Sequence, residues 1–196
     1  MSEVPTDLPI PVDDGLCDHL VDYPVPNITL QPTSDPSPPV NLSTLTGLTI
    51  VFCYPRTGKP TESIPDSWNA IPGARGCTPQ ACSFRDNFRL LKTFGVTNLF
   101  GLSTQSTQYQ KEVKERLKLP YDLLSDKDLQ FVDTLKLPTF EWSGERLVKR
   151  LILVIEDGKV VKCFYPIFPS DRVEDVIDWL KTRPGIMLCD FGGPTG

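Results

Sequence analysis

The sequence predicts a three-layer α/β domain built around a central mixed sheet. Short apolar runs rich in β-branched and aromatic residues alternate with helical stretches, which is typical of α/β proteins. Near the C-terminal end, two apolar runs surround the turn dipeptide Asp157-Gly158 and a further helix follows, so part of the sheet is expected to be antiparallel. The 196 residues are 39% hydrophobic and 23% charged, which suits a single globular domain with an extension.

Composition argues against several classes of protein. The net charge is -5, with 20 Lys+Arg against 25 Asp+Glu, so no basic surface for nucleic acid is expected. The longest apolar runs, such as LILVI at 151–155, are far shorter than the roughly 20 residues that span a bilayer. The N-terminal sequence MSEVPTDLPIPVDDG resembles neither a secretory signal nor a transit peptide, and we therefore expect a reducing, cytoplasmic location.

The first element expected is an arm. Nine of the 20 prolines lie in residues 1–47, where fixed φ angles and missing amide donors oppose regular structure. Residues 1–46 are predicted to form a proline-rich arm, residues 47–183 the domain and residues 184–196 a tail. The domain is expected to open with the buried strand TIVFCY, which lies between Gly47 and Pro55.

The remaining elements follow in order. An irregular insertion is expected at 56–76. The spacing of Phe84, Phe88 and Leu91 predicts a helix over 79–94. The later expectations are a strand in TNLFGLST, a helix at 106–117, a loop in YDLLSD, a helix at 129–137 that Pro138 ends, two strands around Asp157-Gly158, and a capped helix in SDRVEDVIDWLKT with Val173, Val176, Ile177 and Leu180 inward.

The stretch GCTPQACSFRD carries two cysteines five residues apart. Thr78-Pro79 is a helix-start signal, with threonine able to cap and proline suited to the first turn, so Cys77 should lie at a helix N-terminus. Thiols in such places can have pKa values between about 3.5 and 7.5 instead of about 8.5, which makes them nucleophilic. Two buried structural cysteines remain an alternative, and a zinc site is disfavoured by the CxxxxC spacing and the single histidine.

Helix geometry restricts what this pair can do. If Cys77 and Cys82 are both helical, their Cα atoms lie roughly 9 Å apart and face about 140° away from each other. A disulfide requires a Cα separation below about 7 Å. Oxidation of the pair should therefore be coupled to unfolding of the first helical turn.

These residues resemble the active-site segment of the peroxiredoxin superfamily, especially the Q or bacterioferritin-comigratory type. The segments TIVFCYP, FGLSTQS, LPYDLLSD and RLILVIEDGKV also resemble parts of that family, and the similarity extends from about residue 24 to 182. The resemblance implies a thioredoxin-like fold with no bound metal, flavin or other cofactor. It also implies a hydroperoxide substrate, Cys77 as peroxidatic and Cys82 as resolving cysteine, and a thioredoxin-like dithiol reductant, in a monomer or homodimer.

The same resemblance assigns two further residues. Arg150, which precedes the strand LILVIE, matches the family's active-site arginine, although it could also be an ordinary cation at a strand edge. The family places a hydroxyl three residues before the peroxidatic cysteine, and here that position is Ala74. Thr57, after Tyr54-Pro55, is the candidate replacement, and a role in a local turn is an equal alternative.

The predicted function is therefore a thiol peroxidase. A protein disulfide oxidoreductase and a redox sensor with little peroxidase activity are the alternatives. Of the other cysteines, Cys53 and Cys163 fall in predicted strands and are expected to be inert core residues. Cys17 and Cys189 fall near the termini and are expected to be incidental thiols.

Overall fold

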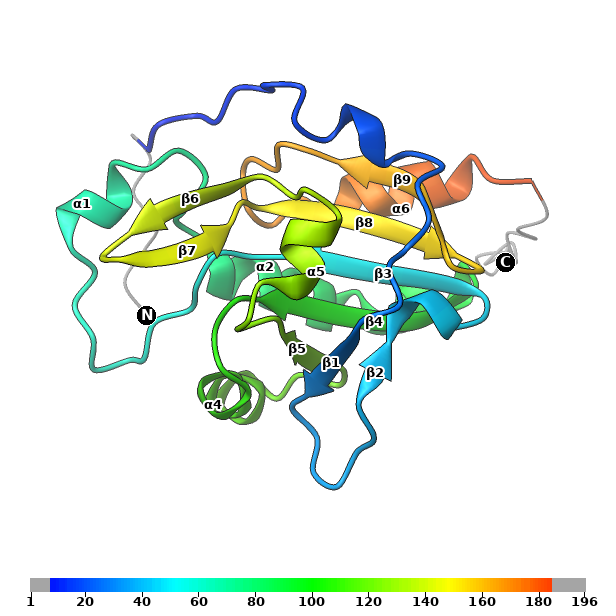
Figure 1. Ribbon diagram of the computed structural model, residues 1–196, viewed down its shortest axis with the longest axis horizontal. Helices are drawn as coiled ribbons and strands as arrows, with labels where there is room; N and C mark the ends of the chain where they lie inside the picture. The colour runs from blue at the N-terminus through cyan, green and yellow to red at the C-terminus, as the bar shows by residue number, and fades with distance from the viewer. Residues whose placement is uncertain (1–7, 185–196) are drawn as a thin grey trace, which may run out of the picture.

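A seven-stranded mixed sheet forms the centre of the molecule, described by a computed structural model over residues 8–184 (Figure 1). Its strand order is β2-β1-β5-β4-β3-β8-β9, and β6 and β7 form a separate hairpin. The strands are β1 (Thr29–Pro32), β2 (Val40–Asn41), β3 (Leu48–Cys53), β4 (Val96–Ser103), β5 (Asp122–Ser125), β6 (Thr139–Trp142), β7 (Glu145–Val148), β8 (Leu151–Glu156) and β9 (Lys159–Phe164). The helices are η1 (Asp18–Leu20), η2 (Leu42–Thr44), α1 (Asp66–Asn69), α2 (Cys77–Asp86), α3 (Phe88–Thr93), α4 (Thr107–Leu117), α5 (Gln130–Thr134) and α6 (Val173–Lys181).

The predicted fold class is confirmed. Strands β3, β4 and β5 are parallel, whereas β8 pairs antiparallel with both β3 and β9. Ile50 and Phe52 of β3 point into a core that includes residues of α2, α3, α4 and α6. Val51 and Cys53, on the opposite face, pack in a second core with residues of η1 and α5. The sheet is thus the middle of three layers, with the larger helices on one side.

Several elements agree with the sequence predictions. The strands β3, β4, β8 and β9 and the helix α4 lie where they were expected, and Ser106 caps α4 by accepting from the amide of Tyr109. Helix α6 buries the four predicted residues Val173, Val176, Ile177 and Leu180. Its predicted side-chain cap is wrong, because the N-cap position is Arg172, which makes no side-chain capping bond.

Other elements differ from the predictions. The single helix expected over 79–94 is two helices, α2 and α3, that meet at Asn87. YDLLSD is not a loop, since it contains β5, whose Leu123 and Leu124 are fully buried. The β6-β7 hairpin was not predicted, although Ser143-Gly144 takes the positive φ angles that a tight hairpin turn requires.

The proline-rich segment contains regular structure that the sequence analysis did not expect. Strand β1 pairs with β5 and with β2, and so extends the main sheet. Leu20, Leu30 and Leu42 are buried in the second core. These apolar side chains, spaced between the prolines, explain why the segment folds against the domain. Of the predicted tail, all but Pro184 lies outside the described residues.

Asp122 fastens β1 to β5 and α4, and its removal should destabilise the fold. Its Oδ1 accepts from Thr33 Oγ1 (3.0 Å), Ser34 N (2.8 Å), Ser34 Oγ (2.7 Å) and Lys114 Nζ (2.6 Å). Burial raises the pKa of Asp122, but the hydrogen bonds from Lys114, Ser34 and Thr33 outweigh it, so the pKa lies below its usual value. Asp122→Asn should lower the free energy of unfolding by about 2 kcal/mol at pH 7.

The pH dependence of this effect follows from the lowered pKa. Because the folded state binds the proton less tightly than the unfolded state, the stabilisation is complete above the unfolded pKa of about 3.9 and is lost as the pH falls through the folded value. Urea titrations of the wild type and Asp122→Asn should therefore converge below about pH 4. An equal difference at pH 7 and pH 3 would contradict this account of Asp122.

Candidate active site

Cys77 lies at a helix N-terminus, as the sequence predicted, but α2 begins at Cys77 itself, two residues earlier than expected. Gly76 is the N-cap residue with φ +104°, and the Gln80 amide donates to the Gly76 carbonyl (3.0 Å) to begin the helix. The predicted cap at Thr78 is wrong, because Thr78 and Pro79 lie inside the first turn. Proline is tolerated there because the first amides of a helix have no intrahelical acceptor.

Arg150 lies between β7 and β8 and reaches the start of α2. Its side chain is buried, with 3% exposed. Its guanidinium donates to Cys77 Sγ (3.3 Å), to Gln80 Oε1, and to the carbonyls of Gly73 (3.3 Å), Ala74 (3.2 Å) and Arg75 (3.1 Å). The structure thus brings two of the predicted residues, Cys77 and Arg150, into direct contact.

The Cys77 sulfur makes two polar contacts of opposite character. It donates its proton to the Ala74 carbonyl (3.6 Å), a bond that exists only while the sulfur is a thiol. In the contact with Arg150 the sulfur instead accepts, from an N–H donor that carries a positive charge. Ala74 is the position where a hydroxyl was missing, and its backbone carbonyl, not its side chain, contacts the sulfur.

Gln80 and Gly76 also shape the site, although the sequence did not point to either residue. Gln80 is buried, and its side-chain oxygen holds Arg150 from the first turn of α2. Gly76 has Ser170 so close that an added Cβ would lie 2.1 Å from the Ser170 Oγ. Both residues stand in the quoted stretch GCTPQ, but their partners lie about 70 and 94 residues later, so only the fold reveals these contacts.

Cys82 lies in the same helix and is half-buried. Burial raises the pKa of its thiol, so Cys82 is a weaker nucleophile at neutral pH than an exposed cysteine. Cys77 and Cys82 are both free. Because both are helical, the geometric condition derived from the sequence holds and the pair cannot bridge without unwinding α2.

A cavity of about 880 Å³ opens onto Cys77. It is much larger than hydrogen peroxide needs and falls within the usual size of small-molecule sites. Its lining contains Cys82 and Thr57 as well as Cys77, so three of the predicted site residues border one space. Among the described residues, five cationic ones line it against the single acid Glu62, namely Arg56, Lys59, Arg75, Arg85 and Arg116.

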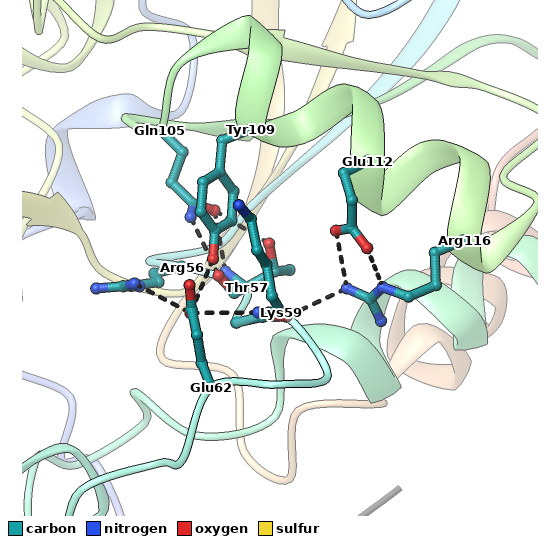
Figure 2. A network of polar contacts seen from close by, with 9 residues as sticks. Arg56, Thr57, Lys59, Glu62, Gln105, Tyr109, Glu112 and Arg116 are labelled. Carbon is teal, nitrogen blue, oxygen red and sulfur yellow. Dashed lines mark hydrogen bonds and ion pairs between the residues drawn. The ribbon is translucent and has the colours of Figure 1, made fainter.

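The insertion at 56–76 forms one wall of this cavity and is anchored to α4 (Figure 2). Glu62 Oε2 accepts from Tyr109 Oη (3.0 Å), from the Lys59 amide (3.2 Å) and from Arg56 (3.4 Å). Arg116, itself paired with Glu112, donates to the Gly58 carbonyl (3.2 Å). The loop is therefore held in place by charge-assisted hydrogen bonds.

Thr57 is buried within this network and points toward Gln105 (Figure 2). Its amide (2.9 Å) and its hydroxyl (3.2 Å) both donate to Gln105 Oε1, and Gln105 Nε2 donates back to the Thr57 carbonyl (3.1 Å). The hydroxyl is thus bonded to Gln105 in this structure, although Thr57 borders the same cavity as Cys77.

The other thiols differ from their expected settings in two respects. Cys53 is fully buried in β3, as expected of a core residue, but Cys163, for which the same was expected, is only half-buried in β9. Cys17 is not an incidental terminal thiol, because it is only 7% exposed and packs in the second core. Cys189 lies outside the described residues.

Residues 8–184 contain no group of three or more His, Cys, Asp or Glu side chains arranged to hold a metal ion. No helix there has the length and apolar character to cross a membrane.

Comparison with known sequences identifies the family. The sequence model of the Redoxin family matches residues 20–178. The chain is 30% identical over 147 residues to peroxiredoxin Bcp of Escherichia coli K12, which covers 72% of this chain and 84% of that protein. It is 29% identical over 109 residues to the chloroplastic peroxiredoxin Q of Suaeda salsa, covering 55% of this chain and 50% of that protein.

Solved structures agree on the fold. Peroxidoxin BcpB of Mycobacterium tuberculosis superposes with a TM-score of 0.65 at 24% identity, over 82% of this chain and 96% of that one. Peroxiredoxin Q of Xanthomonas campestris gives 0.61 at 15% identity, over 90% of this chain and 98% of that one. The fold is therefore the thioredoxin-like fold of these proteins. The chain belongs to the peroxiredoxin superfamily, in its Bcp or Q type, and is a thiol-dependent peroxidase.

Proposed function

We propose that the chain reduces hydroperoxides by a cycle in which Cys77 is the nucleophile and Cys82 the resolving thiol. The observation that carries this assignment is the Cys77 sulfur, which lies at the start of α2, 3.3 Å from the Arg150 guanidinium, beside a cavity of about 880 Å³. The thiolate attacks the terminal oxygen of the hydroperoxide and the O–O bond breaks. The alcohol or water leaves with a proton, and Cys77 becomes a sulfenic acid.

Arg150 contributes charge and orientation to this step. Its guanidinium is fixed by three backbone carbonyls and Gln80, so it needs no rearrangement when negative charge moves from the sulfur to the leaving oxygen. Its remaining interaction, with Cys77, places its charge at the reacting atom.

Resolution requires α2 to unwind. The thiol of Cys82 condenses with the Cys77 sulfenic acid and water is released, but the two residues are fixed on different sides of one helix. Tyr121 holds the middle of this helix, donating to the Ala81 carbonyl (2.7 Å). The first turn, from Cys77 to Gln80, is therefore the part that opens.

Thr57 is proposed as a hydrogen-bond partner for the bound peroxide. Thr57 borders the cavity, and its hydroxyl compensates in this proposal for the absence of a hydroxyl at Ala74. In this role the hydroxyl exchanges its bond to Gln105 for one to a peroxide oxygen.

The remaining parts of the proposal concern partners and place. A thioredoxin-like protein dithiol reduces the Cys77–Cys82 disulfide by thiol exchange. The protein works in the cytoplasm as a monomer or homodimer, without nucleic acid or a membrane.

Stopped-flow measurement of hydroperoxide consumption by the reduced protein tests the function. The wild type should consume one equivalent and lose two thiols, and Cys82→Ser should consume one equivalent and retain a sulfenic acid that a dimedone probe captures at residue 77. Cys77→Ser, which lacks the nucleophile, is the negative control. A wild-type rate no faster than that of free cysteine would overturn the peroxidase assignment. Turnover with protein disulfides alone would favour a disulfide oxidoreductase, and oxidation without turnover would favour a redox sensor.

A further inference from the structure

The N-terminal segment from Asp14 to Pro24 covers the exposed edge of the main sheet. Strand β9 is the last strand on that side, and the segment runs along it in the opposite direction (Figure 1). The Asp22 amide donates to the Val160 carbonyl (2.8 Å), and the Val160 amide donates to the Tyr23 carbonyl (3.1 Å). An isolated bridge pairs Pro24 with Lys159. The N-terminal segment thereby pairs with backbone groups of β9 that would otherwise be unpaired at the edge of the sheet.

The N-terminal end of this segment, at Asp14, is attached just beyond the C-terminal end of β9. Lys149 Nζ donates to Asp14 Oδ2 (2.8 Å) and to Tyr165 Oη (3.3 Å). Cys17 lies between these two attachments and belongs to the second core cluster, against which Cys163 of β9 packs. Both cysteines are free.

We propose that Cys17 and Cys163 form a second redox-active dithiol, separate from Cys77 and Cys82, whose disulfide fastens the N-terminal segment to the edge of the sheet. The backbone pairing at Asp22–Pro24 and the Lys149–Asp14 ion pair hold the segment that carries Cys17 along β9, and neither thiol lies inside an α-helix. The pair can therefore close without the unwinding that α2 requires. The proposal goes beyond the peroxidase cycle and does not depend on it.

The chemistry needs only a hydroperoxide. Cys163, the more exposed of the two, attacks the peroxide oxygen as a thiolate. The O–O bond breaks, the alcohol or water leaves with a proton, and Cys163 becomes a sulfenic acid. Cys17 then attacks the Cys163 sulfur, the S–O bond breaks and water leaves with the Cys17 proton. Two thiols and one hydroperoxide thus give one disulfide, one alcohol and one water.

The local electrostatics assign these two roles. Interaction with the Cys163 thiol, followed by burial, raises the pKa of Cys17 well above its usual value, so Cys17 stays protonated. This suits the resolving partner, and Cys163, the more exposed of the two thiols, is the one that a peroxide reaches first. No arginine comparable to Arg150 contacts Cys163 among the described residues, so its oxidation should be much slower than that of Cys77.

Cys53 is near both thiols but is a poor partner. It is fully buried in β3, and strand β8 separates β3 from β9. Burial also raises the pKa of its thiol well above the usual value. Cys53 is therefore the natural internal control.

Before Asp14, the N-terminal segment reaches the loop that precedes α2. Pro11 packs over Gly73, where an added Cβ would lie 3.5 Å from the Pro11 ring. Gly73 is one of the residues whose carbonyl holds Arg150. The disulfide would thus fix the chain that leads to this loop.

Peptide mapping of the full chain tests the proposal. In a Cys77→Ser/Cys82→Ser background, which removes the catalytic thiols, excess hydrogen peroxide or diamide should consume two thiols and produce a peptide pair linking Cys17 to Cys163. Trypsin would leave Cys17 and Cys53 on one peptide, since the first Lys or Arg is Arg56. A protease that cleaves before aspartate separates them, at Asp18 and Asp35.

Matched variants sharpen the result. The link should persist in a further Cys53→Ser variant and disappear in Cys163→Ser, and oxidation should raise Tm by about 5 °C or more only when the link forms. Absence of the link under both oxidants, or linkage of Cys163 to Cys53, would overturn the proposal. Because the catalytic thiols are absent, neither result bears on the peroxidase assignment.

Discussion

Arg150→Met should lower the second-order rate constant for peroxide consumption by roughly 10³-fold. The substitution removes the guanidinium that donates to the Cys77 sulfur, and with it a fixed positive charge that stabilises the leaving oxygen. It also leaves the carbonyls of Gly73, Ala74 and Arg75 without their donor. Stopped-flow kinetics give the rate, and the rate of iodoacetamide alkylation of Cys77 reports the thiolate separately.

Two variants separate charge from geometry at this position. Arg150→Lys keeps the charge but not the planar set of donors, so it should recover only part of the loss. Arg146→Met removes an arginine of the neighbouring strand β7 that pairs with the exposed Asp133, and it should leave the rate unchanged. If Arg150→Met is folded and reacts within threefold of the wild type, Arg150 has no catalytic role.

The sequence was most informative where a pattern was local. The buried strand β3 follows directly from the run LTIVFC, and the cysteine at the start of α2 follows from the helix that begins in GCTPQ. Arg150 was found only through resemblance, because nothing near it in the chain distinguishes it from an ordinary edge cation. Its function depends on carbonyls about 75 residues earlier.

The wrong predictions for β1, β5 and the cap of α2 share a physical cause. Strands β1 and β5 have only four residues each, and they form because neighbouring strands supply backbone partners, β4 and β1 for β5, and β5 and β2 for β1. Thr78 looks like a cap by residue type, yet Gly76 takes that position because its left-handed φ angle directs the chain into α2. Such choices are decided by contacts that the chain makes only after folding.

Gly76 therefore provides the second large effect. Gly76→Ala should lower the free energy of unfolding by about 3 kcal/mol or more and should also reduce peroxidase activity, because relieving the strain displaces Cys77. Two causes add together. A side chain at φ +104° is strained, and the new Cβ would lie 2.1 Å from the Ser170 Oγ and 2.6 Å from its Cβ.

A comparison variant at Gly95 and a double variant at residues 76 and 170 separate backbone strain from the steric clash. Gly95 has φ +82° with nothing within 4 Å of an added Cβ, so Gly95→Ala should cost only the backbone strain of about 1 kcal/mol. Ser170→Gly removes the clashing side chain and should restore much of the stability and activity of Gly76→Ala. Equal destabilisation in Gly76→Ala and Gly95→Ala, with no rescue by Ser170→Gly, would mean that Ser170 does not constrain the helix start. Rescue of activity together with stability would show that the close packing of residues 76 and 170 positions the catalytic sulfur.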